Sequence, residues 1–216
     1  MSTILVRPHR PAEQLADNVI HIIGVASGLI ACIVLAILAL PSAGARMAVS
    51  VSLYASGLMS MLSCSALYNM ARDGAFKRVL RRLDHSAIFV MIAGTYTPFA
   101  LHVIGGAWGF GLLAFVWTVA VAGVAMKLVW PRRFERLSIV AYLLLGWCIL
   151  VAIDPLLKGI SGPGFVLLIT GGGLYSLGVV FHLWTRLPFQ NAIWHGLVLA
   201  AAGCHYAAIV YEVVPD

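Results

Sequence analysis

Long uncharged runs of apolar residues are the feature of this sequence that most constrains its fold. A helix needs about 20 apolar residues to cross the ~30 Å hydrocarbon core of a bilayer. The longest run, residues 85–126, contains no Lys, Arg, Asp or Glu and is long enough for two spans. Because these runs are continuous and not alternating, they indicate membrane-spanning helices and exclude a membrane β-barrel.

We predict an all-α fold, a bundle of seven transmembrane helices that forms one membrane domain over residues 1–216. Gly105 and Gly106 break the long run between the third and fourth spans. The expected spans cover residues 19–40, 47–70, 85–104, 107–127, 137–153, 165–185 and 192–214, each boundary being approximate.

The distribution of Lys and Arg predicts the orientation of the bundle. With seven spans, twelve of the 14 basic residues fall on one side of the membrane, and only Arg46 and Lys158 fall on the other. The positive-inside rule then places the N-terminus in the cytoplasm and Asp216 outside, in a multi-pass protein of the inner (plasma) membrane. The twelve are Arg7, Arg10, Arg72, Lys77, Arg78, Arg81, Arg82, Lys127, Arg132, Arg133, Arg136 and Arg186.

Composition supports a membrane environment and argues against a nucleic-acid partner. The chain is 62% hydrophobic and 10% charged, whereas soluble domains are roughly 45–50% apolar and about 25% charged. The net charge of +6 comes from short clusters between apolar runs, the pattern of topology signals that face anionic headgroups. We therefore expect the lipid bilayer, and a lipid ligand, as partners; the oligomeric state stays open.

Polar residues inside membrane spans are costly, so their positions are informative. The topology brings a set of them to one level near the cytoplasmic ends of five spans, which predicts a polar pocket built across the bundle. Asp84 also has a simpler interpretation, as the cap of the third span or the partner of Arg81 or Arg82. The set is Asn18, His21, Ser65, Asn69, Asp84, His182, Asn191 and His195.

Several motifs, in order, resemble the hemolysin III family, the bacterial branch of the progestin and adipoQ receptor superfamily. The strongest is residues 83–99, LDHSAIFVMIAGTYTPF. Supporting segments follow the expected spans and cover nearly the whole chain. They are Glu13 with Asn18, His21 and Gly24; Ser65-Ala66-Leu67-Tyr68; Tyr142 with Gly146-Trp147; Gly172-Gly173-Leu174-Tyr175; and Ile193-Trp194-His195 with His205.

The resemblance implies a seven-helix fold with a cytoplasmic N-terminus and a zinc site near the cytoplasmic face. The family pattern is Ser-x-x-x-His on span 2, Asp on span 3 and His-x-x-x-His on span 7, with three imidazoles holding zinc. Ser65 and Asp84 match the supporting positions, and His195 matches one ligand. Asn69 and Asn191 stand where the family has its other two histidines.

These two departures predict weak zinc binding or none, because a neutral amide oxygen is a poor ligand for zinc. Three alternatives stay open. Asp84 becomes a direct ligand, the site takes a harder cation, or the two asparagines hydrogen-bond each other and hold spans 2 and 7 together without metal.

Three functions compete at this stage. The first is a non-catalytic membrane protein of lipid homeostasis or sensing with a degenerate zinc site. The second is a zinc-dependent lipid amide hydrolase, with Asp84 as base or orienting group and Ser65 in support. The third, a cytolytic pore, follows from the family name, although no charged stripe runs through the spans to line an ion path. A proton relay is less favoured because no acid lies at mid-depth.

Overall fold

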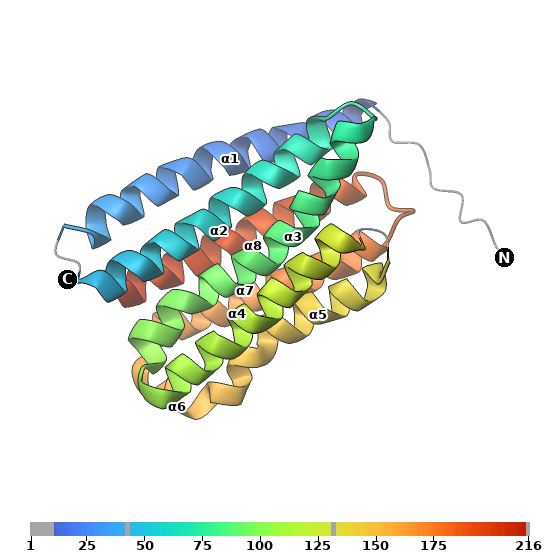
Figure 1. The fold of residues 1–216 in the computed structure, drawn as a ribbon. Coiled ribbons are helices and arrows are strands. Elements are labelled where there is room, and N and C mark those ends of the chain that lie inside the picture. Colours follow the sequence, from blue (N-terminus) through green and yellow to red (C-terminus); the bar gives the residue numbers. More distant parts are fainter. Residues whose placement is uncertain (1–10, 42–43, 131–132, 215–216) are drawn as a thin grey trace.

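Seven long apolar helices form the bundle, the number that the sequence predicts (Figure 1). The computed structural model describes residues 11–41, 44–130 and 133–214. Two of the seven spans contain a change of helix type. The elements are α1 (Pro11–Ala39), α2 (Ala45–Met70), α3 (Ala75–Pro98) with a π-helical turn (Phe99–Ile104), α4 (Gly106–Val129), α5 (Glu135–Trp147) with a 3₁₀ segment (Cys148–Ala152) leading into α6 (Ile153–Gly159), α7 (Gly162–Leu183) and α8 (Gln190–Val213).

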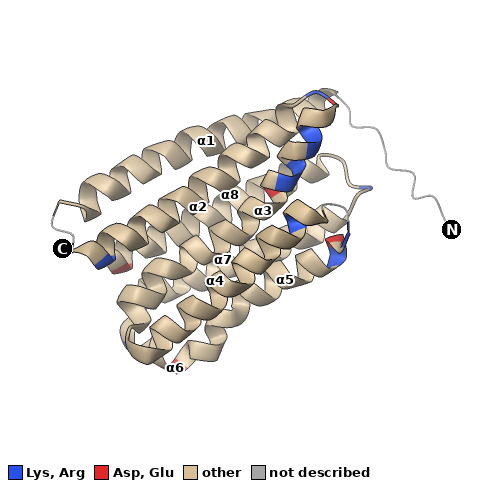
Figure 2. Ribbon diagram, in the orientation of Figure 1, with Lys and Arg blue, Asp and Glu red and all other residues tan. Residues whose placement is uncertain are grey.

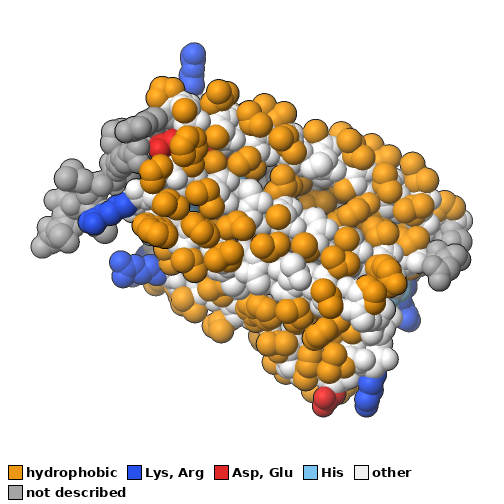
Figure 3. Space-filling model, turned by 180° about the vertical axis from the view of Figure 1, so that it is seen from behind, with side chains coloured by type: hydrophobic (Ala, Val, Ile, Leu, Met, Phe, Trp, Pro, Cys, Tyr) orange, Lys and Arg blue, Asp and Glu red, His pale blue; other side chains and the backbone are white. Residues whose placement is uncertain are grey.

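The outer surface of the bundle is apolar. Large side chains such as Ile30, Val121 and Val151 are 62%, 62% and 74% exposed, and hydrophobic groups cover the face seen in Figure 3 between charged ends. A soluble protein rarely exposes continuous apolar surface on this scale, whereas lipid requires it. The chain is therefore a multi-pass membrane protein whose helices contact the bilayer directly.

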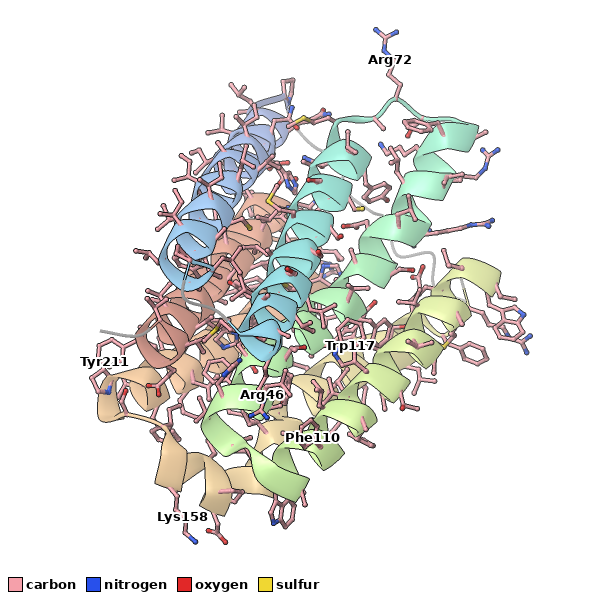
Figure 4. The ribbon with its side chains drawn as sticks, turned by 60° about the vertical axis from the view of Figure 1, so that its left-hand side comes forward. Arg46, Arg72, Phe110, Trp117, Lys158 and Tyr211 are labelled. Carbon is pink, nitrogen blue, oxygen red and sulfur yellow. The ribbon has the colours of Figure 1, made fainter. Side chains whose placement is uncertain are left out.

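Basic residues gather toward one end of the bundle (Figure 2). This basic end, where α2 ends and α3 begins, carries Arg72, Lys77 and Arg78. Figure 4 shows Arg72 pointing away from the bundle there, while Lys158 points away from the opposite end. The charge asymmetry counted in the sequence is thus an asymmetry between two ends of the folded bundle.

The third span is the centre of the bundle. In its most apolar stretch 67% of the residues are buried, against 22–39% in the other spans. α2 packs closely on it because glycines stand at the contact: a Cβ on Gly94 would lie 2.8 Å from the carbonyl oxygen of Leu53, and a Cβ on Gly57 would lie 3.0 Å from that of Val90. Small residues at such positions let helix backbones approach in lipid.

Pro98 and the glycine pair shape the end of this span as the sequence indicates. After Pro98 the helix widens into the π-helical turn, and Gly105 and Gly106 then reverse the chain with φ values of 61° and 55°. Within the preceding turns, the hydroxyls of Thr95 and Thr97 donate to the carbonyls of Met91 and Ala93, at 2.9 and 2.8 Å.

Several helices extend beyond the predicted spans. α1 begins at residue 11 and α3 at residue 75, eight and ten residues before the apolar runs begin. Charged residues end an apolar run in the sequence. A helix nevertheless continues through them where water at the membrane interface or neighbouring side chains satisfy the charge. This extension brings acidic residues of α1 into the bundle.

The fifth span is interrupted, and Tyr96 of α3 stabilises the interruption. Where α5 gives way to the 3₁₀ segment, the Tyr96 hydroxyl donates to the carbonyl of Gly146 at 2.8 Å and accepts from the backbone N–H of Ile149 at 2.9 Å. One phenol thereby satisfies two backbone groups that have no water partner at this depth.

We expect Tyr96→Phe to destabilise the protein by about 1–3 kcal/mol, because it leaves the buried Ile149 N–H without a partner. Thermal unfolding of the detergent-purified protein measures the change. Tyr211→Phe is the matched control, since Tyr211 is 58% exposed. Equal melting temperatures for Tyr96→Phe and the wild type would contradict the assigned role.

Candidate functional site

One face of α1 carries polar residues into the bundle. Glu13, Asp17 and His21 follow one another at four-residue intervals, and their exposed fractions are 7%, 3% and 6%. Residues four apart lie on the same side of a helix, and this side of α1 packs against α2 and α8. Helical periodicity therefore places an acid and an imidazole, one turn apart, inside an apolar structure.

Asp17 connects α1 to α8. The Nδ1–H of His195 donates to Asp17 Oδ1 at 2.6 Å. His21 lies on the other side of the carboxylate, with its Nε2 3.8 Å from the same oxygen, and the two imidazole rings are 4.3 Å apart between centroids. An acid and two histidines thus share one small volume between two helices.

The His21 imidazole is incompletely satisfied. Its Nε2 atom is buried and makes no hydrogen bond within the described part of the chain. Asp17, His21 and His195 each offer one ligand atom within 4.8 Å of the other two, so that together they form a group able to hold a metal ion.

Asp84 and Ser65, the predicted catalytic residues, lie beside this group. Asp84 lies within electrostatic range of His195 and Arg81, and its carboxylate accepts a hydrogen bond from the Ser65 hydroxyl. Arg81 forms an ion pair with Glu135 of α5, so it is not a dedicated partner of Asp84. The structure brings Ser65, Asp84 and His195 together; their catalytic roles stay predictions.

The two asparagines stand at the family's other ligand positions, and for them weak zinc binding or none stays a prediction. Asn69 donates through Nδ2 to Oδ1 of Asn18 at 3.1 Å, so its amide joins α2 to α1. The metal-free alternative had instead expected Asn69 to bond Asn191 and join the second span to the seventh. Asn191 lies half-buried one turn before His195. Neutral amides bind zinc poorly, and of the family's three ligand positions only His195 belongs to the group able to hold an ion.

Asp17 is the site residue that sequence analysis missed. The first span was predicted from an apolar run without charged residues. That run begins at residue 19, so Asp17 fell outside the predicted membrane segment. The available signal was its spacing from His21, four residues apart at the head of an apolar helix. Such a pair directs both side chains to the same neighbour.

Two further histidines lie outside this group. His182, a member of the predicted polar set, is exposed and packs against Trp194 with the rings tilted and their centroids 5.0 Å apart. His205, ten residues beyond His195, bonds through Nε2 to the carbonyl of Leu168 at 3.2 Å.

The fold and this acid–imidazole group define a seven-helix integral membrane protein with a polar site toward one end of its bundle. Residues 12–206 match the family profile described as "Haemolysin-III related". The chain is 38% identical over 203 residues to "Hemolysin-3" of Bacillus cereus, covering 94% of this chain and 93% of that protein. It belongs to the haemolysin-III family.

Further relatives extend the comparison. The "Hemolysin-3 homolog" of Bacillus subtilis (strain 168) is 38% identical over 202 residues, covering 94% of this chain and 95% of its own. The human "Monocyte to macrophage differentiation factor" is 27% identical over 165 residues, covering 73% and 67%. No solved structure matches the chain.

A double-mutant cycle on Asn18 and Asn69 tests the α1–α2 contact beside the site. We expect each alanine variant to be destabilised and the double variant to lose less than the sum, with a coupling energy of about 0.5–1.5 kcal/mol, the range of interhelical hydrogen bonds in membranes. Unfolding in mixed detergent measures all four proteins. Strict additivity would show that the two amides do not interact.

Proposed function

We propose that this protein acts in membrane lipid homeostasis or sensing, with the acid–imidazole group and Asp84 as its ligand site. The 2.6 Å contact between Asp17 and His195, inside an apolar bundle, carries the proposal. Ionisable residues are expensive within membrane spans, and those that persist there mark binding or reaction sites. In this protein the ionisable residues of the site come from three spans, α1, α3 and α8. A single hydrogen-bonded pair would be enough to hold two helices together.

The positive-inside rule supports placing this site at the cytoplasmic leaflet of the plasma membrane. The residues of the site lie in the first three turns of α1, the first two turns of α8 and the first three turns of α3, toward the end where Arg and Lys gather. A cytoplasmic basic end faces anionic headgroups. The site then meets lipid near the headgroup level, where the amide and ester groups of lipids lie.

A second candidate, a lipid amide hydrolase, is favoured by the position of Asp84. A carboxylate that accepts from Ser65 and neighbours His195 is placed to act as a general base or to orient water. The wider superfamily supplies the analogy, which by itself is weak support for chemistry. Hydrolysis of ceramides or other lipid amides by the purified protein with zinc supplied, lost in Asp84→Asn, would place this candidate first.

Cytolysis is a third candidate, carried by the printed name of the Bacillus cereus relative. In the described part of the chain, charged residues gather toward the two ends of the bundle (Figure 2), an arrangement that does not line a path across it. Dye release from liposomes at low protein density would favour this candidate over the first two.

We expect deletion of the gene to change membrane lipid composition and to lower tolerance of envelope stress. The wild-type gene should restore both, and Asp84→Asn should not, because it removes the charge beside His195. Quantitative lipid mass spectrometry is the measurement. His182→Gln, a histidine change outside the group, is the control that should restore both. An unchanged lipid profile and unchanged stress tolerance on deletion would reject the proposal.

The proposed orientation has its own test in a bacterial host. We expect green fluorescent protein fused after Asp216 to stay dark and alkaline phosphatase at the same point to be active, because the C-terminus is outside. Fusions in the loop between α2 and α3 should behave in the opposite way. A fluorescent C-terminal fusion would invert the topology and move the site to the outer leaflet.

A further inference from the structure

The ligand that suits the acid–imidazole group follows from its geometry. Asp17 and His21 come from adjacent turns of α1, and His195 comes from the second turn of α8. Two atoms that ligate one tetrahedral ion at 2.0–2.1 Å lie roughly 3.3 Å apart. The two separations from Asp17 Oδ1, 2.6 Å to His195 Nδ1 and 3.8 Å to His21 Nε2, lie on either side of that value. An ion bound there would replace the proton that His195 Nδ1 shares with Asp17.

A second observation points to a missing partner. His21 is 6% exposed, and its Nε2 has no hydrogen-bond partner in the described part of the chain. Leaving a buried polar atom unsatisfied costs about 1–3 kcal/mol. The Asp17–His195 bond would join α1 to α8 without His21, so packing alone does not explain why a third polar group is buried beside it.

We propose that Asp17, His21 and His195 form a divalent transition-metal site, for which zinc is the first candidate. Two imidazoles and one carboxylate are a ligand set found in catalytic zinc sites and in mononuclear iron(II) sites. The inference deepens the proposed function by naming the ligand of its site. Three protein ligands leave a coordination position open, and Asp84 lies next to His195.

The proposed set differs from the pattern that the family resemblance implies. That pattern takes one imidazole from span 2 and two from span 7, whereas here spans 2 and 7 present Asn69 and Asn191 at two of those positions. Span 1 supplies Asp17 and His21 instead, and His195 is common to both sets. The ion would therefore hold α1 to α8, two helices that begin at the same end of the bundle.

Metal analysis of the full-length protein tests the site. Detergent-purified protein is stripped with chelator, reloaded with zinc, desalted and measured by mass spectrometry. We expect about one zinc per wild-type chain. His21→Gln and Asp17→Asn should weaken zinc binding by at least about 100-fold, since even residues outside the ligand shell alter affinity 10–100-fold. His182→Gln is the matched control, an exposed histidine on α7 that should leave binding unchanged.

Measurements on the wild type keep the test sharp if a variant fails to fold. X-ray absorption of the zinc-loaded protein should show two imidazole ligands, and cobalt substitution should give the intense visible absorption of a four-coordinate ion. A wild type that stays empty with zinc, cobalt, manganese and iron(II) overturns the site. So does full zinc content in folded His21→Gln or Asp17→Asn protein.

The outcome is separable from that of the proposed function. An empty wild type whose deletion still changes lipid composition removes the metal and leaves the lipid role. A loaded wild type whose deletion changes nothing keeps the metal site and removes the lipid role.

Discussion

Within a bilayer only the protein itself can satisfy a polar group, and most of this structure is arranged around that constraint. Tyr96 satisfies the broken backbone of the fifth span. At the start of α7, Glu212 accepts from the backbone N–H of Ser161 at 3.1 Å, and the Ser161 hydroxyl accepts from the N–H of Gly164 at 3.0 Å. Four buried side-chain atoms of the described residues have no hydrogen-bond partner, namely Nε2 of His21 and the hydroxyls of Tyr54, Ser86 and Tyr175. Of these, Nε2 of His21 belongs to a group able to hold a metal ion, and this combination supports a ligand there.

Features that depend on local composition could be predicted from the sequence. Seven apolar runs became seven spans, and Gly105 and Gly106 divide the longest run because both adopt positive φ, which a side chain disfavours. The interruption of the fifth span could not be predicted. No proline marks residues 146–149, and the stabilising hydroxyl belongs to Tyr96, 50 or more residues away in the chain.

The site, like the fold, could be predicted where local sequence determines it and not where helix packing does. Ser65, Asp84 and His195 were expected at one membrane level; in the structure Ser65 hydrogen-bonds to Asp84 and His195 lies within electrostatic range of it, while their catalytic roles stay predictions. Asp17 was missed because apolar-run counting ends a span at the first charge, while the helix continues through the interface. Lys127 shows the converse: it counts as a topology signal in the sequence, yet it is 1% exposed in the folded bundle. Counting charges predicts an orientation but does not show which charged residues are buried in the folded bundle.

The chemistry of the proposed ligand set bears on the choice between functions. Three neutral imidazoles around zinc leave a charge of two, whereas two imidazoles and the Asp17 carboxylate leave a charge of one. A lower charge is held in an apolar bundle at a smaller desolvation cost. The same anionic ligand also makes the ion a weaker Lewis acid, so the pKa of a water bound to it would fall less. Since the same ligand types also activate water in catalytic zinc sites, the set suits an ion that holds the α1–α8 contact, and hydrolysis would in addition require Asp84 as a base.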